Sequence, residues 1–345
     1  MENPRILIRA TNWVGDAVMS LPALRAVRKR FPDAHIAVLA RPWVADLYAR
    51  ESFADRVIPY PPGAGWRDLP AKWRCARALR SQRFDCAILF QNAFEAALVA
   101  RLAGIPRRIG YDRDARGFLL TDAVGVPSRG EIPAHECFYY LELLRRAGFL
   151  DSLPAEVVVR LEGAGQAGEA GRRRFREAGL GDRVAGVSPG AAFGGAKRWL
   201  PERFVEAAVR VAAAQGASVA VFGSTAERDL CGQVVAGIAQ GGRRVENFAG
   251  RSSLSEFIEM AAACLVFLTN DSGAMHVASA AGVPTIAVFG ATNPETTGPA
   301  GPVARVVREP VECSPCLLRE CPIDHRCMTR VPAERVALTA LELLK

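Results

Sequence analysis

The sequence lacks the features of several large protein classes. No apolar run approaches the roughly 18 residues needed to cross a bilayer. The first apolar segment, Ile6 to Ile8, is interrupted by Arg9, and no signal-peptide core follows it. We therefore expect a soluble, intracellular protein.

Several ligand-binding motifs are also missing. The glycine-rich loop from Ser188 to Trp199 has neither the Gly-Lys-Ser/Thr of a P-loop nor the GxGxxG fingerprint of dinucleotide-binding proteins. No recognised nucleic-acid-binding motif accompanies its positive charge. Nothing resembles a pyridoxal phosphate lysine or the second phosphate site that a phosphorylase needs.

The composition is that of a globular protein of more than one domain. Its 345 residues are 50% hydrophobic and 23% charged, which suits two domains of about 150–200 residues. Residues 1–150 carry 23 Lys and Arg against 15 Asp and Glu, whereas residues 151–345 carry 21 of each. The basic N-terminal half indicates either an anionic partner or a solvated arginine-rich surface.

Strand and helix patterns alternate along both halves, which predicts an α/β fold of two doubly wound, Rossmann-like domains. The expected domains are 1–165, 166–331 and a C-terminal helix, 332–345, that packs back towards the N-terminal domain. A stretch rich in Gly, Ala and Glu suggests a linker at about 160–175. The expected strands are Arg5–Ala10, His35–Ala40, Arg56–Ile58, Cys86–Phe90, Arg108–Gly110, Val184–Val187, Ser218–Gly223, Arg244–Phe248, Leu265–Thr269 and Thr285–Phe289. Helices are expected at Trp66–Ser81, Ala93–Leu102 and His276–Ala281, and another begins at Pro201 and ends at Gly216.

The first candidate site is Asn12-Trp13-Val14-Gly15-Asp16, between the first strand and its helix. Gly15 permits a tight turn, and Asp16 lies near a helix N-terminus at the ligand-binding edge of the sheet. Two interpretations remain open. Asp16 caps the helix, or it is a general base that takes a proton from a substrate hydroxyl.

The second candidate is the loop from Ser188 to Trp199, which contains Gly190, Gly194 and Gly195 and ends in Lys197-Arg198-Trp199. Glycines that let the backbone approach a ligand, beside two cations, suit a diphosphate. The alternative is a flexible loop with a solvated basic pair.

The third candidate is Thr269-Asn270-Asp271-Ser272-Gly273-Ala274-Met275-His276, where a strand meets a helix. Amides at Ser272 and Gly273 suit an anion on the helix axis, and His276 is either a phosphate ligand or a core histidine. The loops Gly223-Ser224-Thr225 and Phe289–Pro294 close neighbouring strands. Together these loops indicate a nucleotide site in the C-terminal domain.

These motifs resemble those of the ADP-heptose:lipopolysaccharide heptosyltransferases, glycosyltransferase family 9, and within it the heptosyltransferase II branch. The resemblance covers nearly the whole chain and depends on three segments in order: Trp13–Asp16 with Ser20–Arg25, Pro189–Ala191 with Lys197–Trp199, and Thr269–Gly273 with Met275-His276. It implies a GT-B fold, an ADP-heptose donor bound mostly by the C-terminal domain, and inversion at the anomeric carbon with no cofactor or catalytic metal.

Carried onto this chain, the resemblance makes Asp16 the general base and Lys197 the residue that offsets charge on the ADP leaving group. The other expected substrate-binding residues are Trp13, Gly15, Ser188, Gly190, Arg198, Gly223, Ser224, Asn270, Asp271, Ser272, Gly273 and His276. Some relatives have an acidic residue near the nucleoside after the Gly223 strand end. This chain reads Ser224-Thr225-Ala226-Glu227 there, and no ribose contact is assigned.

Nine cysteines form two groups. Five are scattered through apolar stretches and are expected to be reduced core residues. The other four are Cys313, Cys316, Cys321 and Cys327, and their spacing suits a structural zinc ion, with free thiols in a loop as the alternative.

The expected activity is transfer of heptose to the heptosyl-Kdo2-lipid A inner core. The expected partners are ADP-heptose, a phosphorylated Kdo-lipid A acceptor and, peripherally, the cytoplasmic face of the inner membrane, and no nucleic acid. The alternatives are a type I or III heptosyltransferase, another sugar transferase of the family, a non-catalytic nucleotide-sugar-binding protein, and an epimerase or phosphorylase with the same fold. Presence of both Asp16 and Lys197 argues against a non-catalytic protein.

Overall fold

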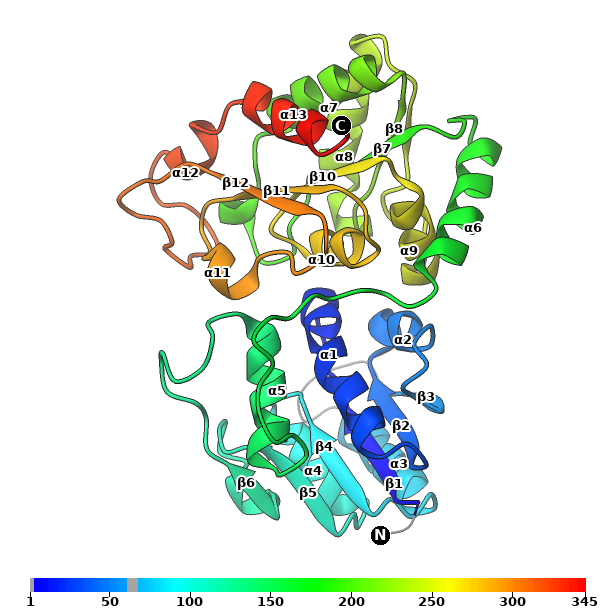
Figure 1. Cartoon of the computed structure of the whole chain (residues 1–345), viewed down its shortest axis with the longest axis vertical. Coiled ribbons are helices and arrows are strands. Elements are labelled where there is room, and N and C mark those ends of the chain that lie inside the picture. Colours follow the sequence, from blue (N-terminus) through cyan, green and yellow to red (C-terminus); the bar gives the residue numbers. More distant parts are fainter. Residues whose placement is uncertain (1–2, 61–67) are drawn as a thin grey trace. The chain divides into compact units, whose positions relative to one another are not determined.

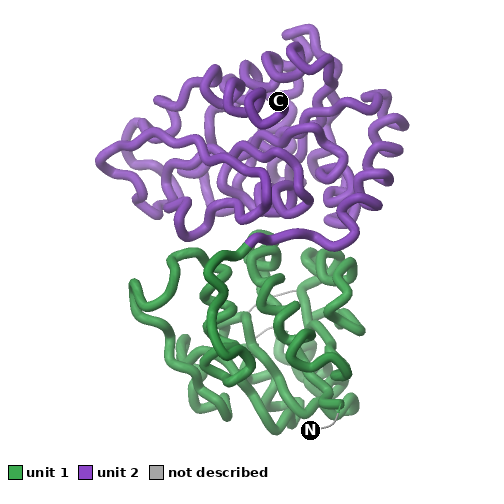
Figure 2. The backbone as a smooth tube through the Cα atoms, viewed as in Figure 1, with its two compact units in different colours: residues 1–157 green, residues 158–345 purple. Residues whose placement is uncertain are grey.

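The computed structural model describes residues 3–60 and 68–345 and divides the chain into two compact units, residues 1–157 and 158–345 (Figure 2). Both units consist of a parallel sheet with helices on its faces (Figure 1). No helix in the described ranges is both long and apolar enough to span a bilayer.

Unit 1 contains a six-stranded parallel sheet in the order β3-β2-β1-β4-β5-β6. Its first two strands pair in register from Arg5 opposite His35 to Arg9 opposite Leu39. The order reverses direction between β1 and β4, which is the topological switch point where doubly wound sheets bind ligands. The strands are β1 (Arg5–Arg9), β2 (His35–Ala40), β3 (Arg56–Pro59), β4 (Cys86–Leu89), β5 (Arg107–Tyr111) and β6 (Asp122–Val124).

The helices of unit 1 cover both faces of this sheet. Helices α3 and α4 share a buried apolar cluster with one face of β1, β2 and β4, and α1 packs beside α5 and α2. Alternate residues of β1 and β2, such as Leu7 and Leu39, point into the α3–α4 cluster, as the period of a strand requires. The helices are α1 (Val14–Arg30), α2 (Pro42–Tyr48), α3 (Leu69–Arg80), α4 (Phe94–Leu102) and α5 (Glu136–Arg146).

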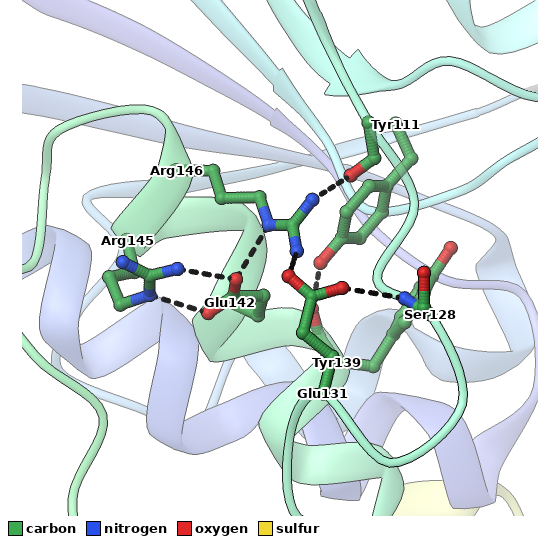
Figure 3. Close-up of polar contacts among 8 residues, drawn as sticks. Tyr111, Ser128, Glu131, Tyr139, Glu142, Arg145 and Arg146 are labelled. Carbon is green, nitrogen blue, oxygen red and sulfur yellow. Dashed lines mark hydrogen bonds and ion pairs between the residues drawn. The ribbon is translucent and has the colours of Figure 1, made fainter.

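A polar network fixes the segment that leads into α5 (Figure 3). Buried Glu142 accepts hydrogen bonds from Arg145 (2.7 Å) and Arg146 (2.6 Å). Arg146 also pairs with Glu131, whose carboxylate accepts from the Ser128 amide at 2.7 Å. These contacts tie residues 125–131 to the helix and so support the segment that precedes its N-terminus.

Unit 2 repeats the same topology, with the sheet order β12-β11-β10-β7-β8-β9. Its switch point lies between β7 and β10, which pair from Val266 opposite Ala185 to Thr269 opposite Ser188. The strands are β7 (Val184–Ser188), β8 (Ser218–Val221), β9 (Val245–Asn247), β10 (Val266–Asn270), β11 (Thr285–Phe289) and β12 (Ala304–Arg308).

One face of the unit 2 sheet packs on α7, α8 and α13 in a single apolar cluster, and the other carries α6, α9 and α10. As predicted, Pro201 begins α7, and Gly216 ends it in the left-handed conformation. The helices are α6 (Ala164–Glu177), α7 (Pro201–Gln215), α8 (Arg228–Gln240), α9 (Leu254–Ala263), α10 (Gly273–Ala280), α11 (Pro294–Thr297), α12 (Arg326–Thr329) and α13 (Ala333–Glu342).

Two expectations about the segments outside the sheets differ from the structure. The stretch expected to be a linker is mostly α6, which packs against α9; Gly171 allows the approach, because a Cβ there would lie 2.0 Å from the Glu259 carbonyl oxygen. The boundary falls at residue 157 because Val159 and Leu161 donate backbone hydrogen bonds to Ala300 and Ala280 of unit 2.

The C-terminal helix α13 lies in unit 2. Its apolar face, which includes Val336 and Ala340, belongs to the unit 2 core and packs against α7. The expected packing of this helix towards the N-terminal domain stays a prediction. The helix is amphipathic as predicted, but its own unit buries the apolar side.

The predicted strands all exist, with ends that differ by a residue or two. The edge strands β6 and β12 were not predicted, because both are short, only partly buried and give a weak apolar pattern. Of the helix predicted at Trp66–Ser81, the structure gives α3 at Leu69–Arg80, and Trp66 lies outside the described residues.

Candidate active site

The second and third motifs meet at the switch point of unit 2. Asn270, at the end of β10, is completely buried and joins the two loops. Its side-chain amide donates to the Pro189 carbonyl at 2.7 Å, and its side-chain oxygen accepts from the Trp199 amide at 2.9 Å. The loop that follows β7 is therefore fixed at both ends by one residue of the neighbouring strand.

An ion pair lies beside this bridge. Lys197 Nζ is 2.5 Å from Asp271 Oδ2, and Thr292 Oγ1 donates to the same oxygen at 2.5 Å. Both charged side chains are largely buried. Three separate loops, after β7, β10 and β11, thus bring a cation, a carboxylate and a hydroxyl together. The sequence placed each residue at a strand end, but it did not predict that Asp271 pairs with Lys197.

The turn after β10 begins α10, with Ser272 at the N-cap and Gly273 as the first helical residue. The predicted order of strand, turn and helix is present, but the helix begins at Gly273 rather than at the predicted His276. Thr269 Oγ1 lies 3.3 Å from Ser272 Oγ. His276 is buried, at 4% exposure. Its predicted contact with a phosphate stays a prediction.

Glu227 lies just after β8, and the sequence alone predicts no role for it. Its carboxylate accepts from the Ser224 amide and hydroxyl, both at 2.8 Å, and caps the short 3-10 helix Thr225–Glu227. A Cβ at Gly190 would lie 2.1 Å from Glu227 Oε1. The absence of a side chain at Gly190 therefore makes room for this carboxylate. A Ser-x-x-Glu capping box after a strand end was the available signal.

The other residues predicted to bind substrate at the ends of β7 and β8 make contacts within unit 2. Ser188 is buried at the end of β7. The Arg198 guanidinium donates to the Ala191 carbonyl at 3.3 Å. Gly223 lies close to Cys231, whose sulfur would be 2.7 Å from a Cβ at that glycine.

The cysteine-rich segment does not form the predicted zinc site. Within residues 3–60 and 68–345, no group of three or more His, Cys, Asp or Glu side chains could hold a metal ion. Cys313, Cys316, Cys321 and Cys327 are all free thiols. Cys313 is exposed, and Cys327 is buried against Gly290. The zinc prediction is therefore not supported.

In unit 1, Asp16 lies in the first turn of α1 and is half-buried. Trp13, at 63% exposure, is the N-cap residue, and Gly15 follows in the first turn. The N-cap is thus not Asp16, although a carboxylate in this turn still favours the helix dipole. Two contacts hold the preceding residue, since Asn12 accepts from Arg9 through its side chain (2.9 Å) and from Trp43 Nε1 through its carbonyl (2.8 Å).

Glu136 is a second carboxyl group of interest in unit 1, and the sequence did not single it out. Burial raises the pKa of Glu136, the first residue of α5, to about 7, and the negative charge of nearby Asp16 adds to the increase. Tyr140 lies one turn further along α5. Burial raises the pKa of its hydroxyl, and the negative charge of Asp16 adds to the increase. Only the packing of α1 against α5 brings these groups together. No local motif marks Glu136.

Cations gather near the carboxyl ends of β1 and β2. The guanidinium groups of Arg9 and Arg41 lie 4.3 and 4.6 Å from the ring centre of Tyr60. Glu95 pairs with Arg41 at 3.2 Å and with Lys72 at 2.7 Å. Burial lowers the pKa of Arg9 to about 10. Part of the positive charge of unit 1 is therefore buried beside the turn between β1 and α1, rather than on a solvated surface.

Comparisons with known proteins agree with this arrangement. The model of the family described as glycosyltransferase family 9 (heptosyltransferase) matches residues 72–326. Lipopolysaccharide heptosyltransferase 2 of Escherichia coli K12 is 32% identical over 309 residues, 88% of each chain. Lipooligosaccharide heptosyltransferase 2 of Haemophilus influenzae is 31% identical over 311 residues, again 88% of each.

Solved structures give the same result. The structure of E. coli ADP-heptose LPS heptosyltransferase II superposes with a TM-score of 0.83 at 29% identity, covering 99% of this chain and 98% of that one. A family 9 glycosyltransferase from Veillonella parvula shares the fold, with a TM-score of 0.84 at 21% identity over 100% and 98% of the two chains. The predicted GT-B fold class is confirmed. Because the family model spans well over half of the sequence and relatives match most of its length, the chain belongs to glycosyltransferase family 9, the heptosyltransferases.

Proposed function

We propose that this enzyme transfers L-glycero-D-manno-heptose from ADP-heptose to the heptosyl-Kdo2-lipid A inner core of lipopolysaccharide, with inversion at the anomeric carbon. Relatives named lipopolysaccharide or lipooligosaccharide heptosyltransferase 2 match 88% of the chain at 31–32% identity, which supports this acceptor over that of a type I enzyme. Unit 2 binds the donor and unit 1 binds the acceptor.

The observation that carries the proposal is the Lys197–Asp271 ion pair at the switch point of unit 2. A lysine that is largely buried, oriented by a carboxylate and a hydroxyl, is a preorganised positive charge at the place where doubly wound sheets bind nucleotides. The nearby amides of Ser272 and Gly273 begin a helix and favour an anion. Glu227, beside Gly190, has the acidic character that suits ribose hydroxyls.

The reaction follows from these groups. Asp16 removes the proton from an acceptor hydroxyl as that oxygen forms a bond to the anomeric carbon of the heptose. The bond from this carbon to the ADP oxygen breaks, and its electron pair leaves with ADP. Lys197 offsets the charge that develops on the β-phosphate. Inversion results because the hydroxyl attacks from the face opposite the leaving group.

The excess of Lys and Arg over Asp and Glu in residues 1–150 suits an acceptor that bears phosphates and Kdo carboxylates. Because that acceptor has a lipid anchor, we expect the enzyme to act at the cytoplasmic membrane face through peripheral, electrostatic contact. Binding to vesicles that contain anionic lipid should weaken as the salt concentration rises.

The proposal is tested by measuring ADP release from ADP-heptose with and without heptosyl-Kdo2-lipid A. Asp16→Asn should bind ADP-heptose as tightly as the wild type while turnover falls about 10²- to 10⁴-fold, the range for loss of a general base. Asp33→Asn, which changes an exposed carboxylate just beyond the other end of α1, is the matched control and should leave turnover unchanged.

Each alternative gives a different result. Release that depends on Kdo2-lipid A instead would identify a type I enzyme. Donor binding without release to either acceptor would keep the donor site but contradict the proposed acceptor. Loss of donor binding in Asp16→Asn would show that Asp16 supports the structure rather than the chemistry.

A further inference from the structure

The cysteine-rich segment 313–327 is built onto the loops of the candidate donor site. At its start, Ser314 Oγ donates to the Gly290 carbonyl at 2.6 Å, and the Leu317 amide donates to the Ala291 carbonyl at 2.8 Å. These contacts attach the segment to the loop after β11, which also carries Thr292.

The same segment then contacts the loop after β7. The Ala196 amide donates to the Arg319 carbonyl at 2.9 Å, and the Gly195 amide donates to Glu320 Oε1 at 2.9 Å. Further along, His325 Nε2 lies 3.0 Å from the Ala196 carbonyl oxygen. The residues immediately before Lys197 are therefore held by this segment.

Two glycines make that approach feasible. A Cβ at Gly194 would lie 2.2 Å from the Arg319 carbonyl oxygen, and one at Gly195 would lie 2.4 Å from Glu320 Oε2. From the sequence, these glycines are predicted to allow the close approach of a ligand. The structure instead fills the space beside them with the chain's own segment 313–327.

The result is a second cation near the ring of Phe193, which Lys197 also contacts. The Arg319 guanidinium lies 5.4 Å from the ring centre of Phe193, and Lys197 Nζ lies 4.8 Å from the same ring centre. Asp271 neutralises Lys197. In the part of the chain that the structure describes, no carboxylate pairs with the Arg319 side chain, which is exposed.

We propose that Arg319 binds the diphosphate of the nucleotide donor, as a second cation beside Lys197. A nucleoside diphosphate brings about two or more negative charges, and Lys197, whose charge Asp271 partly offsets, balances only part of them. A guanidinium offers the bidentate geometry that phosphate oxygens accept, and the ring of Phe193 supports its orientation. This inference rests on the donor site in the proposed function and adds a residue that lies outside its three sequence motifs.

The experiment is titration calorimetry of the full chain with ADP and, separately, with AMP. Arg319→Ala should weaken ADP binding about 10-fold or more, the range for losing a charge-assisted hydrogen bond, and change AMP binding by less than about two-fold. Arg319→Lys should recover part of the ADP affinity, because it keeps the charge but loses the planar fork. Arg305→Ala, at an exposed arginine on β12, is the matched control and should bind both nucleotides like the wild type.

The outcomes separate this inference from the proposed function. Wild-type ADP affinity in Arg319→Ala, or an equal loss for ADP and AMP, would overturn the role of Arg319. Selective loss of ADP binding supports it, even if the wild type transfers no heptose, in which case only the proposed reaction fails. A wild-type chain that binds no ADP would overturn both.

Discussion

Replacement of Asn270 by Ala should destabilise unit 2 and weaken nucleotide binding together. The side chain is completely buried and satisfies two backbone groups of the loop after β7, the Pro189 carbonyl and the Trp199 amide. Each buried group left without a partner costs about 1–3 kcal/mol, so the expected loss is about 2–6 kcal/mol. For a unit of this size, 1 kcal/mol lowers Tm by about 2–4 °C, which predicts a decrease of at least about 4 °C.

The assay is scanning calorimetry of the full chain, combined with ADP titration. Asn247→Ala is the control, because Asn247 is half-buried and its side chain accepts one hydrogen bond, from the Ala249 amide at 3.0 Å. It should cost about 0.5–1.5 kcal/mol and leave ADP binding unchanged. If Asn270→Ala melted like the wild type and bound ADP with the same Kd, Asn270 would not be what joins the two loops.

Two further substitutions test other contacts. Glu136→Gln removes a carboxyl group whose pKa burial raises to about 7, with a contribution from Asp16. Because this group is protonated in the folded chain at pH values where it is ionised in the unfolded chain, the wild type should lose stability relative to the variant as the pH rises from 4.5 to about 7. Urea unfolding on both sides of that range checks the sign, and a constant difference would contradict it. Gly190→Ala should displace the Glu227 carboxylate and weaken ADP binding, as measured by titration, whereas Gly232→Ala, in open space within α8, should preserve binding and stabilise the helix by about 0.5–1 kcal/mol.

The predictions that succeeded concern features that local sequence encodes. Buried strands of a parallel sheet are short apolar runs, and Pro201 and Gly216 mark the ends of α7 by backbone chemistry alone. Three motifs in order were also enough to predict the family, because each consists of particular residue types in a short segment at the end of a strand. The sequence alone therefore determined the α/β class, the two similar halves and the family 9 membership.

The tertiary structure decided which side chains meet. Lys197 and Asp271 are 74 positions apart and pair because β7 and β10 are neighbours in the sheet. Glu136 acquires its raised pKa from burial and from Asp16, and α5 packs beside α1. The spacing of residues within one motif does not predict such contacts between distant segments.

The cysteine-rich segment shows the same limit. Its spacing suggested zinc, yet folding uses the backbone around Arg319 to hold the loop before Lys197. The sequence thus determined which elements form and which family they belong to. Only the packing of those elements decided the partners of each charged group, because ion pairs and buried carboxyls depend on distances between segments far apart in the chain.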